Sequence, residues 1–188
     1  MRLWEKLGSR RVVQESKSSR VQVFRCAREM WRRRSDNEMS GASVDGKLVA
    51  AARGAAGAEG IDAALVCAVV EQESGWNTWA MRYEPLFFAK YVASLYTNNK
   101  VGATEAYARG MSWGLMQVMG QTAREHGLSS PFLSTLCEPA TGLAVGCRIL
   151  QHRLDAAGGD AAKALLSWNG GANRDYPAEV LARVGGYR

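Results

Sequence analysis

The pattern of apolar and polar residues predicts a mainly helical chain. Between residues 61 and 74, apolar side chains occupy almost the full circumference of a helix as far as Val70, which is typical of a helix in the centre of a domain. A capped helix precedes it, which begins around Ser43-Val44-Asp45 and is closed by Gly57 and Gly60. No run alternates with the period of two that marks a half-buried strand. The fold class expected is therefore mainly α, with a minor β-hairpin at most. Further helices are expected over residues 85–96, 118–127, 139–157, 160–167 and 176–184, with a loop or lid over residues 98–110.

The positive charge of the chain is concentrated at its N-terminal end. Residues 1–40 hold eleven Lys and Arg against five Asp and Glu, whereas residues 41–188 hold thirteen of each, so the first segment carries the whole net charge of +6. We therefore predict a basic N-terminal extension over residues 1–42 and one compact domain over residues 43–188. The extension lacks a clear hydrophobic period, which favours a disordered or incidental segment. An amphipathic arm attracted to anionic envelope polymers is the alternative.

Signals for export and for cofactors are absent from the sequence. No run approaches the roughly 20 apolar residues that span a bilayer, and the N-terminus lacks the apolar centre of a secretory signal. The four cysteines have neither the spacing of a metal knuckle nor that of a dense disulfide framework. No metal or other cofactor is therefore expected. Cys137 and Cys147 flank a predicted helix start and allow one disulfide, although two buried free thiols are the favoured state.

Glu73 is the first candidate for chemistry. At 100° per residue it shares a helix face with Val69 and Val70, while Glu71 points to roughly the opposite side. Glu73 also lies in the last turn before Gly75, where the carbonyl groups carry partial negative charge. That field and partial desolvation both favour the protonated acid. A carboxylic acid that holds its proton near neutral pH is what cleavage of a sugar acetal requires.

Glu73 stands in the first of four short sequence boxes. They are Glu73-Ser74-Gly75-Trp76-Asn77, Ser112-Trp113-Gly114-Leu115-Met116-Gln117, Ala164-Leu165-Leu166-Ser167-Trp168-Asn169-Gly170-Gly171 and Tyr176-Pro177. Their order and residue types resemble the soluble lytic transglycosylase catalytic domain of the lysozyme-like superfamily, over roughly residues 45–183. The resemblance implies a lysozyme-like helical fold with a substrate groove. It also implies cleavage of the β-1,4 bond between N-acetylmuramic acid and N-acetylglucosamine in bacterial peptidoglycan.

The resemblance gives Glu73 the role of sole catalytic acid and base. Glu73 would protonate the leaving oxygen and then deprotonate the C6 hydroxyl of muramic acid, which yields a 1,6-anhydro product. The substrate's own N-acetyl group and hydroxyl would replace the nucleophile and the water, so this scheme needs no second enzyme carboxylate, unlike that of most glycosidases. Ser74 is expected either to orient Glu73 by a hydrogen bond or to bond to its own helix backbone.

The second box implies a wall of the substrate groove. Gly114 allows the backbone to pass close to a sugar, and the Gln117 amide offers both a donor and an acceptor. Trp113 has a flat apolar face suited to a pyranose ring. Met116 is assigned to the same wall. For both Trp113 and Met116, a place in the hydrophobic core is the alternative.

The last two boxes imply further contacts near the cleaved bond. The chain has Trp168-Asn169 where the family usually has Tyr-Asn, so a hydroxyl is lost while a broad aromatic surface remains. Asn169 matches the expected polar contact near the cleavage site. Tyr176 matches a late Tyr that usually sits near the catalytic Glu and holds it in place, with a core position as the alternative.

The segment between Glu73 and Gly114 is about twenty residues longer than expected for compact members of the family. Such inserts are similar to those of phage and prophage members, and this one is expected to build a lid or a wall of the groove. Glu84 in the insert is a candidate second carboxylate. If Glu84 faced Glu73 across the cleft and positioned a water, the enzyme would be a hydrolytic muramidase.

Two hypotheses from other functional classes remain. A catalytically silent glycan-binding or phage structural module would keep its function when Glu73 is removed. The hypothesis of a nucleic-acid-binding protein depends on the basic extension alone, and the neutral charge of the domain disfavours it. We expect a monomer that acts on peptidoglycan glycan strands. Without a secretory signal, its route to the wall would be release through holin pores, delivery in a virion or a dedicated secretion machine.

Overall fold

The computed structural model describes residues 44–188. Residues 1–43, and with them the predicted basic extension, lie outside the described residues. The chain divides after Ala42 into two units, and the second, from Ser43 onward, is described by itself. Within the described part, no helix is long and apolar enough to cross a membrane.

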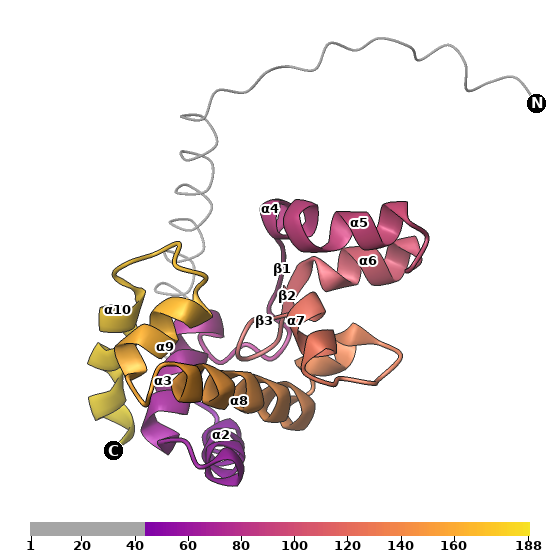
Figure 1. Cartoon of the computed structure of the whole chain (residues 1–188). Coiled ribbons are helices and arrows are strands. Elements are labelled where there is room, and N and C mark those ends of the chain that lie inside the picture. Colours follow the sequence, from indigo (N-terminus) through magenta and orange to yellow (C-terminus); the bar gives the residue numbers. More distant parts are fainter. Residues whose placement is uncertain (1–43) are drawn as a thin grey trace, which may run out of the picture. The chain divides into compact units, whose positions relative to one another are not determined.

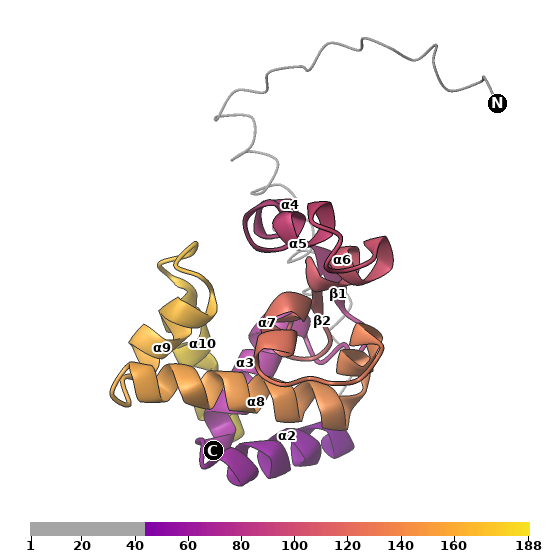
Figure 2. The same ribbon diagram turned by 45° about the vertical axis from the view of Figure 1, so that its right-hand side comes forward.

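Helix α3 (Ala63–Ser74) runs through the centre of the domain (Figures 1 and 2). It begins at the N-cap Asp62, whose side chain accepts a hydrogen bond from the Ala64 amide, and its residues are then buried without a break as far as Val70. Helix α2 (Gly46–Glu59) packs against α3 and also against α8 (Pro139–Ala156). The prediction of a central, fully enclosed helix is therefore confirmed.

Helix α8 crosses α3 and closes the core on the face turned forward in Figure 2. It packs against α2 on one side and α9 (Ala161–Trp168) on the other, while α10 (Tyr176–Val184) packs against α3. The other helical segments after residue 119 are α7 (Gly120–Glu125), the 3-10 helix η2 (Leu133–Cys137) and the 3-10 helix η3 (Gly185–Tyr187).

A small antiparallel sheet connects the helical core to the rest of the domain. Strands β1 (Met81–Tyr83), β2 (Met111–Trp113) and β3 (Val118–Met119) are joined in the order β1-β2-β3. Met81 pairs with Trp113, and Tyr83 pairs with Met111. Strands of two or three residues are too short to show a period of two, which is why the sequence predicted a hairpin at most. The expected fold class, mainly helical with a minor β component, is confirmed.

The residues between β1 and β2 form a helical insert, defined here as residues 84–110. The first helix predicted in this region is present as one continuous run of α4 (Pro85–Phe87), the π-helical η1 (Phe88–Val92) and α5 (Ala93–Thr97). Helix α6 (Ala103–Arg109) follows, so the prediction of a loop over residues 98–110 is wrong for its second half. Only Ala106 of α6 is buried, and one buried position leaves no periodic pattern to read.

A charged cluster anchors the insert to the core domain. Glu105 on α6 accepts hydrogen bonds from Arg109 at 2.8 Å and from Arg124 on α7 at 2.8 Å, and Arg109 also donates to Gln121. Burial raises the pKa of Glu105, but the hydrogen bonds and charges of Arg124 and Arg109 outweigh it, so the pKa lies below its usual value. A carboxylate with a lowered pKa stabilises the fold at neutral pH, and this stabilisation is lost as the pH falls through the folded-state pKa.

We expect Glu105→Gln to destabilise the protein at pH 7 by roughly 1–3 kcal/mol, because the charge-assisted hydrogen bonds from Arg109 and Arg124 lose their anionic acceptor. In thermal unfolding followed by circular dichroism, the difference in Tm between wild type and variant should shrink as the pH falls through the lowered pKa of Glu105, where the wild-type carboxylate becomes protonated. Glu138→Gln, at an exposed glutamate, is the matched control. A difference that stays constant down to pH 3 would contradict the electrostatic origin.

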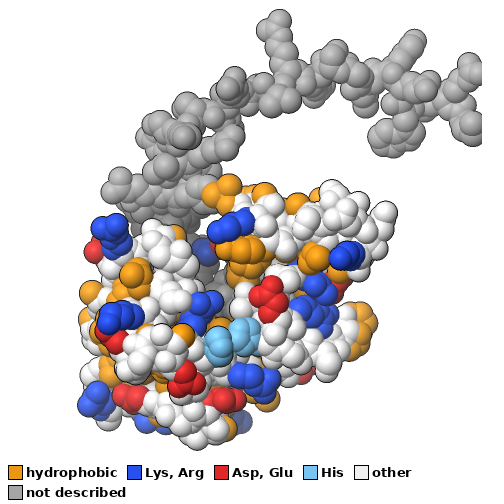
Figure 3. Space-filling model, viewed as in Figure 1, with side chains coloured by type: hydrophobic (Ala, Val, Ile, Leu, Met, Phe, Trp, Pro, Cys, Tyr) orange, Lys and Arg blue, Asp and Glu red, His pale blue; other side chains and the backbone are white. Residues whose placement is uncertain are grey.

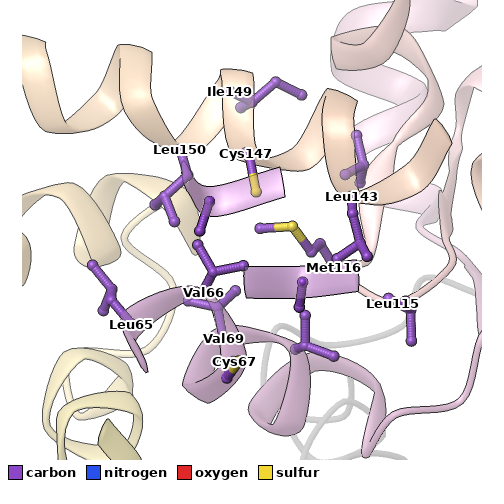
Figure 4. Packing of buried hydrophobic residues seen from close by; sticks show 14 of the residues in the cluster. Leu65, Val66, Cys67, Val69, Leu115, Met116, Leu143, Cys147, Ile149 and Leu150 are labelled. Carbon is purple, nitrogen blue, oxygen red and sulfur yellow. The ribbon is translucent and has the colours of Figure 1, made fainter. Parts of the chain in front are cut away.

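The hydrophobic core lies between α3, α8 and the turn after β2 (Figure 4). Met116 is fully buried at its centre, where a Cβ added at Gly146 of α8 would lie only 2.4 Å from the Met116 sulfur. Cys137 and Cys147 are buried free thiols, which confirms the favoured expectation over the disulfide. Burial raises the pKa of Cys147 to about 12, so its thiolate does not form near neutral pH.

Candidate active site

Glu73 lies half-buried in the last turn of α3, where the chain leaves the core. The helix ends at Gly75, whose φ of +56° is left-handed, and Trp76 follows with a φ of +67°. A left-handed tryptophan costs of order 1–3 kcal/mol and persists only where its surroundings hold it. Trp76 is buried, and its indole N–H donates to the hydroxyl of Tyr187 at 2.9 Å. These contacts fix the sharp turn directly after Glu73.

Two side chains from the C-terminal helices hold the Glu73 carboxylate. The Trp168 indole N–H donates to Oε1 of Glu73 at 3.0 Å, and the Tyr176 hydroxyl donates to the same oxygen at 2.5 Å. Tyr176 is 4% exposed. Burial, followed by the charge of Glu73, raises the pKa of Tyr176 well above its usual value, so the phenol keeps its proton and acts as the donor. Glu73 is thus oriented by two neutral donors that cannot give up their protons near neutral pH.

The loop between α9 and α10 positions both donors. Trp168 is the last residue of α9, and Tyr176 is the first of α10. Between them, the Asn169 side-chain oxygen accepts a hydrogen bond from the Asn173 amide at 2.8 Å, and the Asn173 side chain accepts one from the Asp175 amide at 3.0 Å. Asn169 is half-buried and shapes this loop. The third and fourth sequence boxes are therefore brought onto the first by a single turn of the chain.

The second box forms the tight turn between β2 and β3. The Gln117 side-chain oxygen accepts a hydrogen bond from the Ser112 hydroxyl at 2.9 Å, and its Nε2 donates to the carbonyls of Ala80 and Gly114, each at 3.0 Å. The Gly114 amide also donates to the Ala80 carbonyl at 2.7 Å. The amide of Gln117 thus ties this turn to the start of β1, and its donor and acceptor both have partners within the protein.

Three of the predicted contact residues are turned toward the interior. Trp113 is 8% exposed and donates to the Ala108 carbonyl at 2.9 Å, and Met116 has no exposed surface. Both therefore occupy the core positions that the sequence left open as alternatives. The Ser74 hydroxyl is buried and donates to the Val70 carbonyl of its own helix at 3.1 Å, which is the second of its two expected roles.

Glu84 lies at the start of the insert, directly after β1. Its carboxylate accepts a hydrogen bond from Arg82 and forms an ion pair with the same guanidinium, and its backbone amide donates to the Gly110 carbonyl at 3.0 Å. Glu84 is thus paired with a cation on the strand that precedes it. Within residues 44–188, no group of three or more His, Cys, Asp or Glu side chains is arranged to hold a metal ion.

Sequence reasoning missed the network at the C-terminal end that supports the turn after Glu73. The Tyr187 hydroxyl accepts from Trp76 and donates to Oε2 of Glu71 at 2.8 Å, and Arg183 lies 3.5 Å from the other Glu71 oxygen. Glu71 indeed points away from Glu73, as the helix geometry predicts, but no sequence signal identified Tyr187 as its partner. Contacts over more than one hundred residues of chain leave no local pattern.

The face of the domain seen in Figure 3 is hollowed. Comparison with Figure 1, which has the same view, places α9 and α10 on one side of the hollow and the sheet and insert on the other. Helix α3 ends between these two sides. A carboxylic acid held at such a helix end by defined donors is suited to proton transfer during cleavage of a glycosidic bond.

Comparison with known proteins gives the family. Residues 50–180 match the family described as the transglycosylase SLT domain. Because that match spans more than half of the chain, the chain belongs to the transglycosylase SLT domain family. Membership supports a lysozyme-like fold and lytic transglycosylase-type degradation of peptidoglycan. Among solved structures, no significant match to the chain is found.

Proposed function

We propose that the protein is a peptidoglycan lytic transglycosylase that uses Glu73 as its single catalytic acid and base. The cleaved bond is the β-1,4 linkage between N-acetylmuramic acid and N-acetylglucosamine, and the product carries a 1,6-anhydromuramic end. The observation that carries this proposal is the convergence of Trp168 and Tyr176 on one oxygen of Glu73. A side chain that only reached into solvent from a helix end would not need one buried and one half-buried donor directed at the same oxygen.

Glu73 acts first as an acid and then as a base. Its carboxylic acid passes a proton to the leaving sugar oxygen while the side chains of Trp168 and Tyr176 hold the group in place. After bond cleavage, the Glu73 carboxylate accepts the proton of the C6 hydroxyl of muramic acid, which attacks C1 of the same sugar. The two donors stabilise the carboxylate formed in between. No other enzyme group has to supply a nucleophile or a water.

The pairing of Glu84 with Arg82 supports the single-carboxylate scheme. A second catalytic carboxylate must bind a water or attack the sugar, and the carboxylate of Glu84 is instead held by a neighbouring guanidinium. The hydrolytic muramidase therefore stands second. The phage or prophage origin, the monomeric state and the attraction of residues 1–42 to anionic envelope polymers stay predictions.

The product decides between the two reactions. Digestion of purified peptidoglycan should release muropeptides that mass spectrometry finds lighter by one water than hydrolysed muropeptides, because the C6 hydroxyl replaces water as the attacking group. Reducing-end products would show that the protein is a muramidase, and Glu84 would again be the candidate for a second catalytic carboxylate. The absence of any cleavage by the folded chain on several wall types would favour a glycan-binding module.

Removal of one donor to Glu73 should slow the reaction without abolishing it. Tyr176→Phe keeps the buried ring and loses one hydrogen bond to a carboxylate, so we expect kcat to fall roughly tenfold to a hundredfold. KM should change little, because the hydroxyl of Tyr176 bonds to Glu73 and is not expected to contact the substrate. Tyr96→Phe, at an exposed tyrosine of α5, is the control. Equal rates for Tyr176→Phe and wild type would show that this donor does not orient the catalytic group.

A further inference from the structure

Large apolar side chains are exposed along β1 and its surroundings. Trp79 is 73% exposed, Met81 56%, Tyr83 38% and Tyr107 53%. We call these four residues the exposed strip. Met81 and Tyr83 are two residues apart on β1 and therefore share one face of the strand, and Trp79 lies in the turn immediately before it. The ring of Tyr107 on α6 lies 5.9 Å from that of Tyr83.

The strip is held in place by the insert. Phe88 lies 5.9 Å from Tyr83 and 5.3 Å from Tyr107, with the second pair stacked. Gly110 is buried against Phe88 and Tyr83, where a Cβ would come within 2.8 Å of the Phe88 ring. In the turn before β1, the Asn77 side chain accepts a hydrogen bond from the Trp79 amide at 2.9 Å. The exposed rings are thus carried on a fixed backbone, which lowers the entropic cost of binding a ligand to them.

The strip follows Glu73 closely along the chain. Only the turn over residues 75–80 separates α3 from β1, and Figure 3 shows hydrophobic side chains gathered on the side of the hollow formed by β1 and the insert. Strand β1 is also an edge strand of the described sheet, so one side of its backbone has no strand partner there. Flat aromatic faces beside unpaired amide and carbonyl groups match a sugar ring that carries hydroxyl and acetamido groups.

We propose that the exposed strip is a binding platform for sugar residues of the glycan strand beyond the disaccharide cleaved at Glu73. This inference rests on the proposed function, because it takes the same polymer as the ligand. The rings of Trp79 and Tyr83 stack on successive parts of the strand, and the edge of β1 binds its polar groups. The platform makes binding depend on strand length, since short fragments fill the cleavage site without reaching the strip.

The test measures binding and therefore does not depend on cleavage. In the Glu73→Gln background, isothermal titration compares glycan strands freed of stem peptides, in a long fraction and a tetrasaccharide fraction. Trp79→Ala should weaken binding of the long fraction about threefold to tenfold and leave the tetrasaccharide unchanged. Phe132→Ala, at a 69% exposed phenylalanine on the loop before η2, is the matched control and should leave both unchanged.

The platform is overturned if Trp79→Ala leaves the long fraction unaffected, if it weakens both fractions equally, or if Phe132→Ala has the same effect. It is also overturned if the Glu73→Gln protein does not bind the long fraction. Cleavage is scored separately in the wild type. Length-dependent binding through Trp79 without cleavage would support the platform and contradict the proposed reaction. Cleavage with no effect of Trp79→Ala on binding would support the reaction and contradict the platform.

Discussion

Glu73→Gln should lower the rate of peptidoglycan cleavage by about a thousandfold or more, because it removes the only proton donor and acceptor that the proposed mechanism uses. The amide oxygen of Gln can still accept the hydrogen bonds of Trp168 and Tyr176, so the fold and the Tm should change little. The measurement is release of soluble muropeptides from purified walls, with circular dichroism as the check of folding.

Glu71→Gln is the matched control, because it changes the same residue type two positions earlier on α3. Glu71 binds Tyr187 and lies near Arg183, on the opposite side of the helix from Glu73. We expect its substitution to reduce stability and to leave kcat within a few fold of wild type. If Glu73→Gln kept more than about a tenth of the wild-type rate, general acid catalysis by Glu73 would be wrong, since such catalysis contributes at least a hundredfold.

Gly114→Ala should destabilise the protein by about 3–5 kcal/mol, an effect on packing rather than on substrate. Gly114 has a φ of +67°, and a Cβ there would lie 2.2 Å from the Leu136 carbonyl oxygen, which belongs to the backbone of η2. The left-handed conformation alone costs an alanine roughly 1 kcal/mol. The clash adds more because backbone atoms on both sides must move. Urea unfolding of the purified variant measures the loss, if the variant folds at all.

Gly60→Ala separates the two contributions. Gly60 ends α2 with a φ of +71°, close to that of Gly114, but no atom lies within 4 Å of the place where its Cβ would be. Its substitution should therefore cost only the conformational share, about 1 kcal/mol. Equal decreases in the free energy of unfolding for the two variants would show that the contact with Leu136 does not contribute to the cost of Gly114→Ala.

The sequence predicted the parts of this protein that rest on local patterns. Helix α3, its end at Gly75 and the orientation of Glu73 away from Glu71 follow from apolar periodicity and capping residues, which act within a few residues of chain. Helix α10 has the predicted bounds, from Tyr176 to Val184. The strands, by contrast, are two or three residues long, which is too short for an alternating pattern, and β1 pairs with β2 across some thirty residues of chain.

The roles of single side chains depended on tertiary contacts. From the sequence, Trp168 was an aromatic surface that had lost a hydroxyl, but its indole N–H supplies a hydrogen bond to Glu73 in the structure. Gln117 was a predicted sugar contact, yet its amide is engaged by Ser112, Ala80 and Gly114. A sequence shows which donors and acceptors are available, and only the folded backbone decides which of them meet.

By itself, the sequence determined the class of fold and the position of the acid, because both follow from residues that are near one another in the chain. The tertiary structure alone decided what holds that acid, since Trp168 and Tyr176 are brought to Glu73 from about a hundred residues away by the packing of α9 and α10. It also decided that Trp76 donates to Tyr187, more than one hundred residues further along the chain. Hydrogen bonds and ion pairs act over a few ångströms, so their partners are fixed by packing and not by order in the chain.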